Sequence, residues 1–292
     1  MKPAIHIQPH GGIGNQLFQY AVGRHLALRN QSALLVDRSW FQPGLGREFG
    51  LGQFESVYGD DPTRVPSRVR RSTWRLAMKA PRACNTFLPH TYVDCGEAFD
   101  KQIFCQLPGV RLIGYFQSWR YFWDIRNELA AEISSLRSPS PQFMHLSARL
   151  NDGRPRAAVH VRRGDFLRAG HATYHSIVPI SYYAEALNRI PIEPDWIIEF
   201  HSDDPQLVND LREKAGLPNE FVNMEDFTQI LPIERIWLMA QTDAIIGANS
   251  SMSLWAAYLS AAPGRNIVFP LSWYTHRTIV PSDRFLPDWQ LI

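Results

Sequence analysis

The stretch Ala157-Ala158-Val159-His160-Val161-Arg162-Arg163-Gly164-Asp165 decides the fold expected for the second half of the chain. Its apolar first part predicts a strand over 157–161, and the polar residues after it mark the carboxyl end of that strand. Further strand patterns then alternate with helical ones: strands are expected at 196–202, 220–224, 243–247 and 266–270, and helices at 181–190, 205–215, 232–242 and 251–260. Strands that alternate with helices of this length predict a doubly wound parallel sheet.

The beginning of the chain also alternates strand and helix. A strand is expected at 4–8, a helix at 15–30 and a second strand at 33–37, with a Gly-rich turn, residues 10–15, at the first junction. The Pro-, Ser- and Arg-rich stretch 137–155 reads as a linker between the two halves. We therefore expect an α/β fold of two Rossmann-like halves facing each other across a cleft, with domains at 1–150 and 151–292.

Length and composition bound the class of protein. The 292 residues suffice for one large or two ordinary domains, and 45% hydrophobic with 20% charged residues is typical of a globular chain. A formal net charge of +2 is too small to indicate nucleic-acid binding, so no nucleic-acid partner is expected. Cys84, Cys95 and Cys105 are spaced too widely for a metal knuckle and predict ordinary thiols in a reducing compartment.

The sequence also carries an expectation about location. Its first residues run straight into the expected strand, without the charged and apolar regions of a signal peptide. No apolar run approaches the ~18–20 residues that a membrane-spanning helix needs. We therefore expect a soluble protein of the cytoplasm.

Arg162 and Arg163 are candidates for binding an anionic ligand. Guanidinium groups bind phosphate bidentately and stay charged at any working pH, and ligands of open α/β sheets bind beyond the carboxyl ends of the strands. A diphosphate therefore suits this position. The alternative is a pair of surface arginines with Asp165 as a local ion-pair partner.

The Gly-rich turn His10-Gly11-Gly12-Ile13-Gly14-Asn15 is a second candidate for an anion site. It begins like a dinucleotide fingerprint, but Leu17 stands where the third glycine belongs, which disfavours a dehydrogenase. Gly12, Gly14 and Asn15 would still let backbone amides approach an anionic group at a helix N-terminus. The alternative is a tight turn in which Asn15 caps the helix.

Two more polar motifs follow expected strands. In Ser202-Asp203-Asp204, one aspartate suits a helix cap, and the other is left at the sheet edge to accept the N1–H and amine of a guanine. The alternative is that both aspartates only cap the helix or are solvated. In Asn249-Ser250-Ser251, the side chains suit either capping or a phosphate nest. Because several such motifs converge on one sheet edge, the sequence predicts a nucleotide site there.

An ordered set of motifs resembles glycosyltransferase family 11, the α-1,2-fucosyltransferases. The set consists of residues 11–21, Gly114-Tyr115-Phe116-Gln117-Ser118, residues 160–165, Ser202-Asp203-Asp204, Asn249-Ser250-Ser251 and the closing Leu286-Pro287-Asp288-Trp289. The resemblance implies a GT-B-like fold and a GDP-β-L-fucose donor. It also implies transfer with inversion to the 2-hydroxyl of a galactose, without a metal or other cofactor. No Asp-x-Asp motif of metal-dependent transferases occurs in the sequence.

The resemblance further implies roles for single residues. Arg162 matches the residue that contacts the β-phosphate, with Arg163 nearby, and Ser250 and Ser251 match phosphate contacts. His160 and one of Asp203 and Asp204 match positions that bind guanosine. Asp165 is the first candidate for the general base, with a purely structural role as the alternative.

The aromatic segment 115–123 is a candidate platform for the acceptor sugar. Tyr115 and Trp119 offer ring faces that stack on sugars, and Gln117 offers an amide that reaches hydroxyl groups. The alternative is a buried strand that leads into a helix. The expected acceptor is a galactose-terminated oligosaccharide or a lipid-linked glycan, as in lipopolysaccharide or O-antigen synthesis.

A basic amphipathic helix is expected at 67–82. Arg68, Arg71, Arg75 and Lys79 recur at helical spacing, and Val69, Thr73, Leu76 and Ala80 lie on the opposite face. Such a helix is suited to peripheral contact with the inner face of an anionic membrane. The alternative is a solvated helix that packs on its own domain.

Two competing functions also stay open: transfer from another nucleotide sugar, and nucleotide or carbohydrate binding without turnover.

Overall fold

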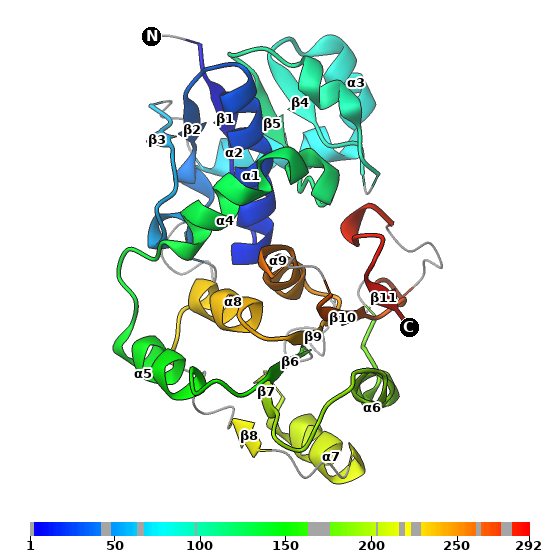
Figure 1. Cartoon of the computed structure of the whole chain (residues 1–292). Helices are drawn as coiled ribbons and strands as arrows, with labels where there is room; N and C mark the ends of the chain where they lie inside the picture. Colours follow the sequence, from blue (N-terminus) through cyan, green and yellow to red (C-terminus); the bar gives the residue numbers. More distant parts are fainter. Residues whose placement is uncertain are drawn as a thin grey trace. The chain divides into compact units, whose positions relative to one another are not determined.

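The computed structural model describes residues 3–41, 48–62, 67–96, 98–162, 176–202, 204–215, 220–222, 229–260, 264–275 and 282–292. The chain divides into two compact units (Figure 1). The N-terminal unit comprises Met1–Ser138 and Pro281–Phe285, and the C-terminal unit comprises Pro139–Val280 and Leu286–Ile292. Each unit has its own parallel sheet, so the expected pair of α/β halves is confirmed.

The sheet of the N-terminal unit has the strand order β3-β2-β1-β5-β4. Its strands are short: β1 Ile5–Ile7, β2 Leu34–Val36, β3 Gly59–Asp60, β4 Thr91–Val93 and β5 Arg111–Ile113. All described pairings between them are parallel, so the loops that follow β1, β2, β4 and β5 leave from one edge. Helices and 3₁₀ turns make the connections: α1 Ile13–Arg29, η1 Arg38–Trp40, η2 Leu51–Gln53, α2 Ser67–Lys79, α3 Pro81–Phe87, η3 Lys101–Cys105, η4 Trp119–Tyr121, η5 Trp123–Ile125, α4 Arg126–Ser134 and η7 Ser282–Arg284.

The sheet of the C-terminal unit has the order β11-β10-β9-β6-β7-β8, and its described pairings are all parallel. Its strands are β6 Arg156–Val161, β7 Ile197–Ser202, β8 Glu220–Val222, β9 Ala244–Ile246, β10 Asn266–Phe269 and β11 Gln290–Leu291. The helices are α5 Pro141–Leu150, α6 Ile180–Arg189, α7 Pro205–Ala215, α8 Pro232–Ala240 and α9 Ser251–Leu259. In Figure 1, α6 and α7 cover one face of this sheet, and α8 and α9 cover the other. The doubly wound sheet predicted from residue 157 onward is therefore confirmed.

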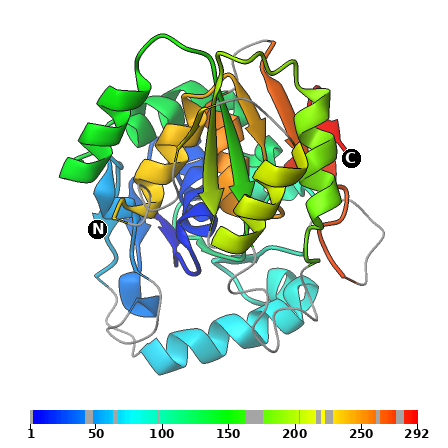
Figure 2. The ribbon, with the colours of Figure 1, turned by 90° about the horizontal axis from the view of Figure 1, so that it is seen from below.

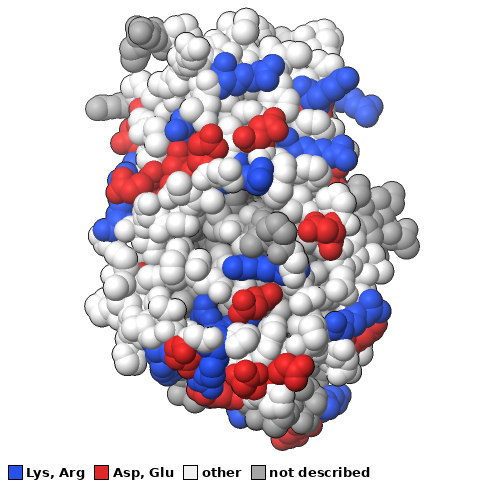
Figure 3. Space-filling model, viewed as in Figure 1, with Lys and Arg blue, Asp and Glu red and all other residues white. Residues whose placement is uncertain are grey.

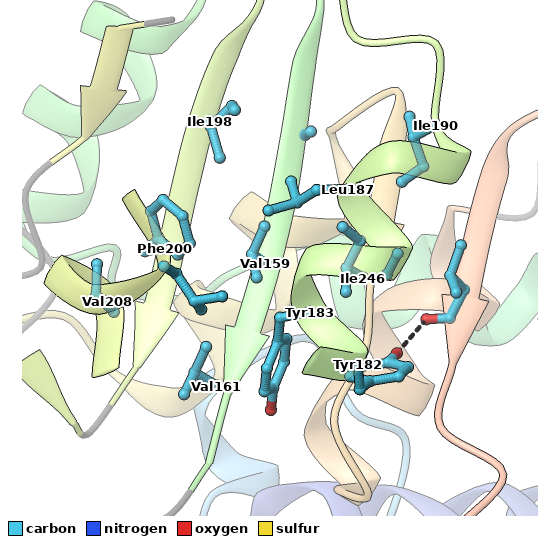
Figure 4. Close-up of a cluster of buried hydrophobic side chains, with 14 of the residues drawn as sticks. Val159, Val161, Tyr182, Tyr183, Leu187, Ile190, Ile198, Phe200, Val208 and Ile246 are labelled. Carbon is cyan, nitrogen blue, oxygen red and sulfur yellow. Dashed lines mark hydrogen bonds between the residues drawn. The ribbon is translucent and has the colours of Figure 1, made fainter. Parts of the chain in front are cut away.

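Apolar side chains fix α6 and α7 on the C-terminal sheet (Figure 4). Val159 and Phe200 of the strands pack with Tyr183 of α6 and Val208 of α7, and all four are buried. Strands covered on both faces need apolar side chains on both, and β6 and β7 supply them, although Glu199 and His201 interrupt the apolar residues of β7. Tyr182 of α6 also hydrogen-bonds to the sheet side of the unit: its hydroxyl lies 2.7 Å from the carbonyl of Gly247 and 3.1 Å from that of Val268.

The stretch predicted as a linker contains a helix instead. Helix α5 occupies Pro141–Leu150, begins at the cap Ser140, and packs on α8 of its own unit through Phe143 and Trp237, whose rings lie 5.4 Å apart. Ser140 also donates to the Glu234 carboxylate from its backbone and its hydroxyl. The units consequently divide between Ser138 and Pro139 rather than between 150 and 151.

The basic helix at 67–82 forms, but it packs on a different side from the predicted one. It ends at Lys79, because Pro81 starts the next helix, α3. Trp74, Ala77 and Met78 face the core of the unit beside Val93 and Ile113. The expected apolar face points outward instead, with the side chains of Val69 and Leu76 50% and 70% exposed.

Two further expectations concern cysteines and membrane spans. All three cysteines are free thiols, as expected. Within the described ranges, no helix combines the length and the apolar character needed to cross a bilayer.

Candidate functional site

The carboxyl edge of the C-terminal sheet gathers three of the predicted motifs. Val161 pairs with Ser202 across β6 and β7, and Val159 pairs with Ile246 across β6 and β9. Arg162, half-buried directly after β6, therefore lies between the segments that follow β7 and β9. The structure brings together the strand ends that carry Arg162, Asp204 and residues 247–250, which is the arrangement predicted for a nucleotide site.

His160 lies one residue inside this edge. It pairs with His201 on β7, and both imidazoles are buried. Burial lowers the pKa of His160 well below its ordinary 6.5, and the positive charges of Arg162 and Arg235 lower it further. The imidazole is therefore neutral at physiological pH, and its Nδ1 is a buried polar atom without a hydrogen-bond partner in the described structure.

A buried charge cluster supports this edge from within the sheet. The Glu199 carboxylate, fully buried on β7, lies 2.8 Å from Arg156 Nη1 and 3.1 Å from His201 Nε2. Burial lowers the pKa of His201, and the hydrogen bond and charge of Glu199 only partly oppose this effect. Sequence reasoning missed Glu199, and the available signal was an acidic residue inside an otherwise apolar strand.

Several predicted donor-binding residues carry structural roles as well. Asp204 accepts the Leu207 N–H at 3.1 Å and so caps α7, which is the role foreseen for one of the two aspartates. Ser250 caps α9 by accepting the Met252 N–H, and Ser251 is the first residue of that helix. Asn249 donates its amide to the carbonyls of Ser176 and Trp273, at 2.6 and 3.3 Å. Arg163, Asp165 and Asp203 lie outside the described residues.

The Gly-rich turn of the N-terminal unit is held by side chains of the helix that follows it. Helix α1 begins at Ile13 with Gly12 as its cap residue, so Gly14 and Asn15 lie in its first turn and Asn15 is not the cap. Buried Gln19 accepts the His10 N–H at 2.9 Å, and Gln16 donates to the Gly11 carbonyl at 3.0 Å. A Cβ added at Gly12 would meet no described atom within 4 Å, so packing among the described residues does not require a glycine there.

The segment after β5 meets this turn. Gln117 Nε2 donates to Asn15 Oδ1 at 2.8 Å, which joins a predicted acceptor residue to a predicted donor residue. Residues 114–118 form neither a strand nor a helix, and Phe116 has a φ of +52°, in the left-handed region. Trp119 follows this segment at the start of η4, and its ring packs on Trp123 with 5.6 Å between centroids.

Asp94, at the end of β4, holds the same segment in place. Its Oδ2 accepts the Phe116 N–H at 2.8 Å, and Gly114 has a φ of +144° with no room for a Cβ beside Asp94. Burial raises the pKa of this carboxyl from 3.8 to about 6, although the backbone N–H groups and Arg284 oppose the shift. Asp94 was missed from the sequence, because nothing local distinguishes it from a solvated aspartate.

The raised pKa of Asp94 gives a testable dependence of stability on pH. Because the folded pKa lies above the unfolded one, the stabilising contribution is complete below about pH 4 and is lost as the pH rises through about 6. Asp94→Asn cannot titrate, so its stability relative to wild type should rise by about 2–3 kcal/mol from pH 4 to pH 7. Urea unfolding of both proteins across this range measures the difference, and a difference that does not change with pH contradicts the assignment.

Aromatic rings from distant segments surround His10 at the edge of the N-terminal sheet. The imidazole centroid lies 5.1 Å from Trp40, 4.4 Å from Trp74 and 4.6 Å from Tyr115. We call these four residues the His10 cluster. Of its members, the sequence singled out only Tyr115 as a site residue.

Two polar atoms inside the His10 cluster are unsatisfied. His10 Nε2 and Trp74 Nε1 are buried and have no hydrogen-bond partner in the described structure. Burial lowers the pKa of His10 to about 4, so the ring is neutral, and the contact of Nδ1 with the Gln8 carbonyl at 3.3 Å assigns the ring proton to Nδ1. Nε2 is then a hydrogen-bond acceptor beside the Trp74 N–H donor, and this pair of groups matches a hydroxyl.

Comparison with known proteins gives one family and several relatives. The family model for glycosyl transferase family 11 matches residues 75–292. The chain is 25% identical to the O-antigen biosynthesis glycosyltransferase WbnK of Escherichia coli, over 90% of this chain and 93% of that one. It is 26% identical to an Escherichia coli alpha-1,2-colitosyltransferase, over 96% and 95% of the two chains. It is also 25% identical to galactoside alpha-(1,2)-fucosyltransferase 1 of Lagothrix lagotricha, over 97% of this chain and 73% of the relative.

Solved structures share the fold. The fucosyltransferase NodZ from Bradyrhizobium superposes on 88% of this chain and 93% of its own, with a TM-score of 0.52 and 17% sequence identity. The overlap extends through both α/β units, which accords with the sequence prediction of the fold.

Proposed function

The chain belongs to glycosyl transferase family 11, and on that premise we propose that it transfers L-fucose from GDP-β-L-fucose to the 2-hydroxyl of a terminal galactoside. The chain is thus a glycosyltransferase, and fucosyl transfer is its activity type. The observation that carries the finer proposal is the position of Arg162 between the segments that follow β7 and β9. A fixed guanidinium there is suited to the diphosphate of a nucleotide sugar.

We assign the donor to the edge of the C-terminal sheet. Arg162 contacts the β-phosphate in this proposal, with Arg163 and the Asn249-Ser250-Ser251 segment around the diphosphate. Asp204 already caps α7, so Asp203 is the aspartate proposed to accept the guanine N1–H and amine. His160 is neutral and nearly enclosed, which suits a contact with the uncharged guanosine rather than with a phosphate. Within the N-terminal unit, Gly12 and Gly14 offer backbone N–H groups at the start of α1 that suit an anionic group. The Asn15 N–H already donates to the Gly12 carbonyl at 3.0 Å, so we propose that Asn15 acts through its side chain.

The proposed reaction is a direct displacement with inversion. The galactose O2 forms a bond to C1 of fucose while the bond from C1 to the β-phosphate oxygen breaks, and GDP leaves with the bonding electrons. Negative charge grows on the β-phosphate during this step, so Arg162 would bind the transition state more tightly than the substrate. We propose Asp165 as the base that accepts the hydroxyl proton. No Asp-x-Asp motif is present to hold a metal, and the proposal is metal-independent.

We assign the acceptor to the edge of the N-terminal sheet. Tyr115 offers a half-buried ring, and His10 Nε2 with Trp74 Nε1 offers the acceptor and donor that one sugar hydroxyl would satisfy. Gln117, fixed by Asn15, is suited to contact a further hydroxyl. In this proposal the structure extends the acceptor set predicted from the sequence by His10, Trp40 and Trp74.

This assignment predicts a selective kinetic effect. Tyr115→Ala should raise the KM for the galactoside about tenfold, equivalent to ~1.4 kcal/mol of binding, because stacking holds ground state and transition state alike. The turnover number and the KM for GDP-fucose should change little, and Tyr115→Phe should retain acceptor binding.

Initial rates at varied acceptor concentration measure the effect. Trp119→Ala, whose ring packs on Trp123, is the matched control, and an equal rise in that variant contradicts the assignment.

A second donor substrate should be tested alongside GDP-fucose. The relative named as an alpha-1,2-colitosyltransferase covers this chain as fully as the fucosyltransferase does, so a nucleotide-linked colitose is the second candidate donor. Competition between the two donors for the same protein separates them.

The proposal is tested by release of GDP from GDP-fucose, with and without lactose, in excess chelator. Release stimulated by lactose supports transfer to a galactoside without a metal. Release that ignores lactose points to another acceptor or to hydrolysis. A folded protein that binds GDP but releases none from GDP-fucose excludes this donor. We further propose that the natural acceptor is a galactose-terminated glycan carried on a lipid at the cytoplasmic face of the membrane, as in O-antigen synthesis.

A further inference from the structure

Helices α2 and α3 carry apolar side chains that the protein leaves exposed. Leu76 and Val69 of α2 are 70% and 50% exposed, and Phe87 and Leu88 at the end of α3 are 78% and 49% exposed. The inward side of α2 is already occupied by Trp74, Ala77 and Met78. Figure 2 shows α2 and α3 (cyan) along the margin of the ribbon, beyond the strands of their unit. Val69 and Leu76, seven residues apart, lie on the same side of α2, and Phe87 and Leu88 are consecutive, so the four residues form two groups. Grouped exposed apolar residues mark an interaction surface more often than isolated ones do.

The same segment is the most basic part of the chain. Residues 62–93 contain seven Lys and Arg and no Asp or Glu, whereas the rest of the chain holds 23 Lys and Arg against 28 Asp and Glu. Arg75, Lys79 and Arg82 are exposed beside the apolar residues. Figure 3 shows basic and acidic side chains close to one another over much of the face that it presents. This segment is therefore a cationic surface on an otherwise acidic protein.

We propose that the α2–α3 surface, consisting of Val69, Arg75, Leu76, Lys79, Arg82, Phe87 and Leu88, docks on an anionic lipid bilayer. The cations bind lipid headgroups, each contributing an attraction that falls off within a Debye length, and the apolar side chains enter the boundary between headgroups and acyl chains. The surface thereby binds the protein to the membrane without a spanning helix.

The combination of side chains favours a bilayer over other anionic partners. A nucleic acid would use the cations but leave the exposed Leu76 and Phe87 in water. An acidic protein partner would need a defined groove for these apolar groups, whereas a bilayer accepts them on a convex helix surface. This inference does not depend on the proposed transfer reaction, because membrane docking and turnover on a soluble acceptor are measured separately.

Vesicle co-sedimentation of the full chain tests the proposal. The protein should pellet with vesicles of phosphatidylcholine and phosphatidylglycerol at low salt, and much less with phosphatidylcholine alone. Arg75→Gln with Lys79→Gln should lower the partition coefficient about 30-fold, because each cation near the surface contributes about a fivefold factor. Leu76→Ser with Phe87→Ser should lower it at least about tenfold by removing apolar insertion.

Matched variants control for general charge and hydrophobicity. Lys101→Gln with Lys214→Gln removes two exposed lysines elsewhere, and Leu271→Ser removes a leucine that is 48% exposed in the other unit. Both controls should pellet like wild type, and all variants should keep wild-type turnover on a soluble galactoside. The proposal is overturned if wild type does not pellet with anionic vesicles, if it binds RNA but not vesicles, or if the controls lose as much binding as the α2–α3 variants.

Discussion

Replacing Arg162 by alanine is expected to lower the turnover number about 100- to 1000-fold, a loss of ~2.7–4 kcal/mol in transition-state stabilisation. Arg162 follows β6 directly, and its charge is felt at His160, whose pKa it lowers. In the proposed reaction, the β-phosphate gains charge as the bond to fucose breaks, so the guanidinium acts most strongly at the transition state. The turnover number should therefore fall far more than the affinity for GDP.

Steady-state rates together with calorimetric GDP binding measure this effect. Arg162→Lys should recover only part of the loss, because a lysine keeps the charge but not the planar fork. Arg154→Ala is the matched control, since Arg154 lies just before the same strand and pairs with Asp152 and Glu220 at the surface. An Arg162→Ala protein that turns over at more than a tenth of the wild-type rate refutes the assigned role.

Replacing Glu199 by alanine is expected to lower the free energy of unfolding by about 3–5 kcal/mol. Glu199 is fully buried, and it is the anion that faces the Arg156 guanidinium at 2.8 Å and His201 at 3.1 Å. Removing the carboxylate leaves the nearly buried Arg156 charge without this partner, and desolvation of that charge is no longer offset. The loss is a large part of the ~5–15 kcal/mol that stabilises an ordinary domain.

Urea unfolding measures the loss, and the neighbouring strand provides a matched control. Glu220 on β8 pairs with Arg154, but both side chains are well exposed, so Glu220→Ala should cost less than ~1 kcal/mol. Equal effects of the two substitutions would show that the Glu199 cluster contributes no more than a surface ion pair. His201 of this cluster immediately precedes Ser202 and pairs with His160, so loss of the cluster should also weaken GDP binding.

The C-terminal unit could be predicted closely because its signals are local. The strands predicted at 157–161 and 196–202 match β6 and β7 within a residue, because Val159, Ile198 and Phe200 mark strands that are covered on both faces. Pro205, Pro232 and Ser250 mark helix starts that the structure places at α7, α8 and α9. Strand ends then fix where Arg162 and Asn249 must lie.

Much of the N-terminal unit could not be predicted in this way. Strands β3, β4 and β5 have only two or three residues, too few to show a period. Helix α2 carries apolar residues on two sides, and sequence alone did not show that Trp74 and Ala77, rather than Leu76, face the core. Tertiary packing decided that question.

The site residues show the same difference between local and long-range signals. Residues in compact motifs, such as Arg162 and Gln117, could be singled out, whereas the His10 cluster joins Trp40, Trp74 and Tyr115 from segments far apart in the chain. Glu199 and Asp94 were missed because their importance comes from burial, which the sequence does not display. The one local signal for His10 was its position between a strand and the Gly-rich turn.

Inverting transfer of fucose to the 2-hydroxyl of a galactoside is tested by the structure of the product. The product formed from GDP-β-L-fucose and lactose is isolated and its new linkage determined by NMR. We expect an α-L-fucosyl unit, with a cross-peak between fucose C1 and galactose H2. A β-linked product, or attachment at any other hydroxyl, would contradict it.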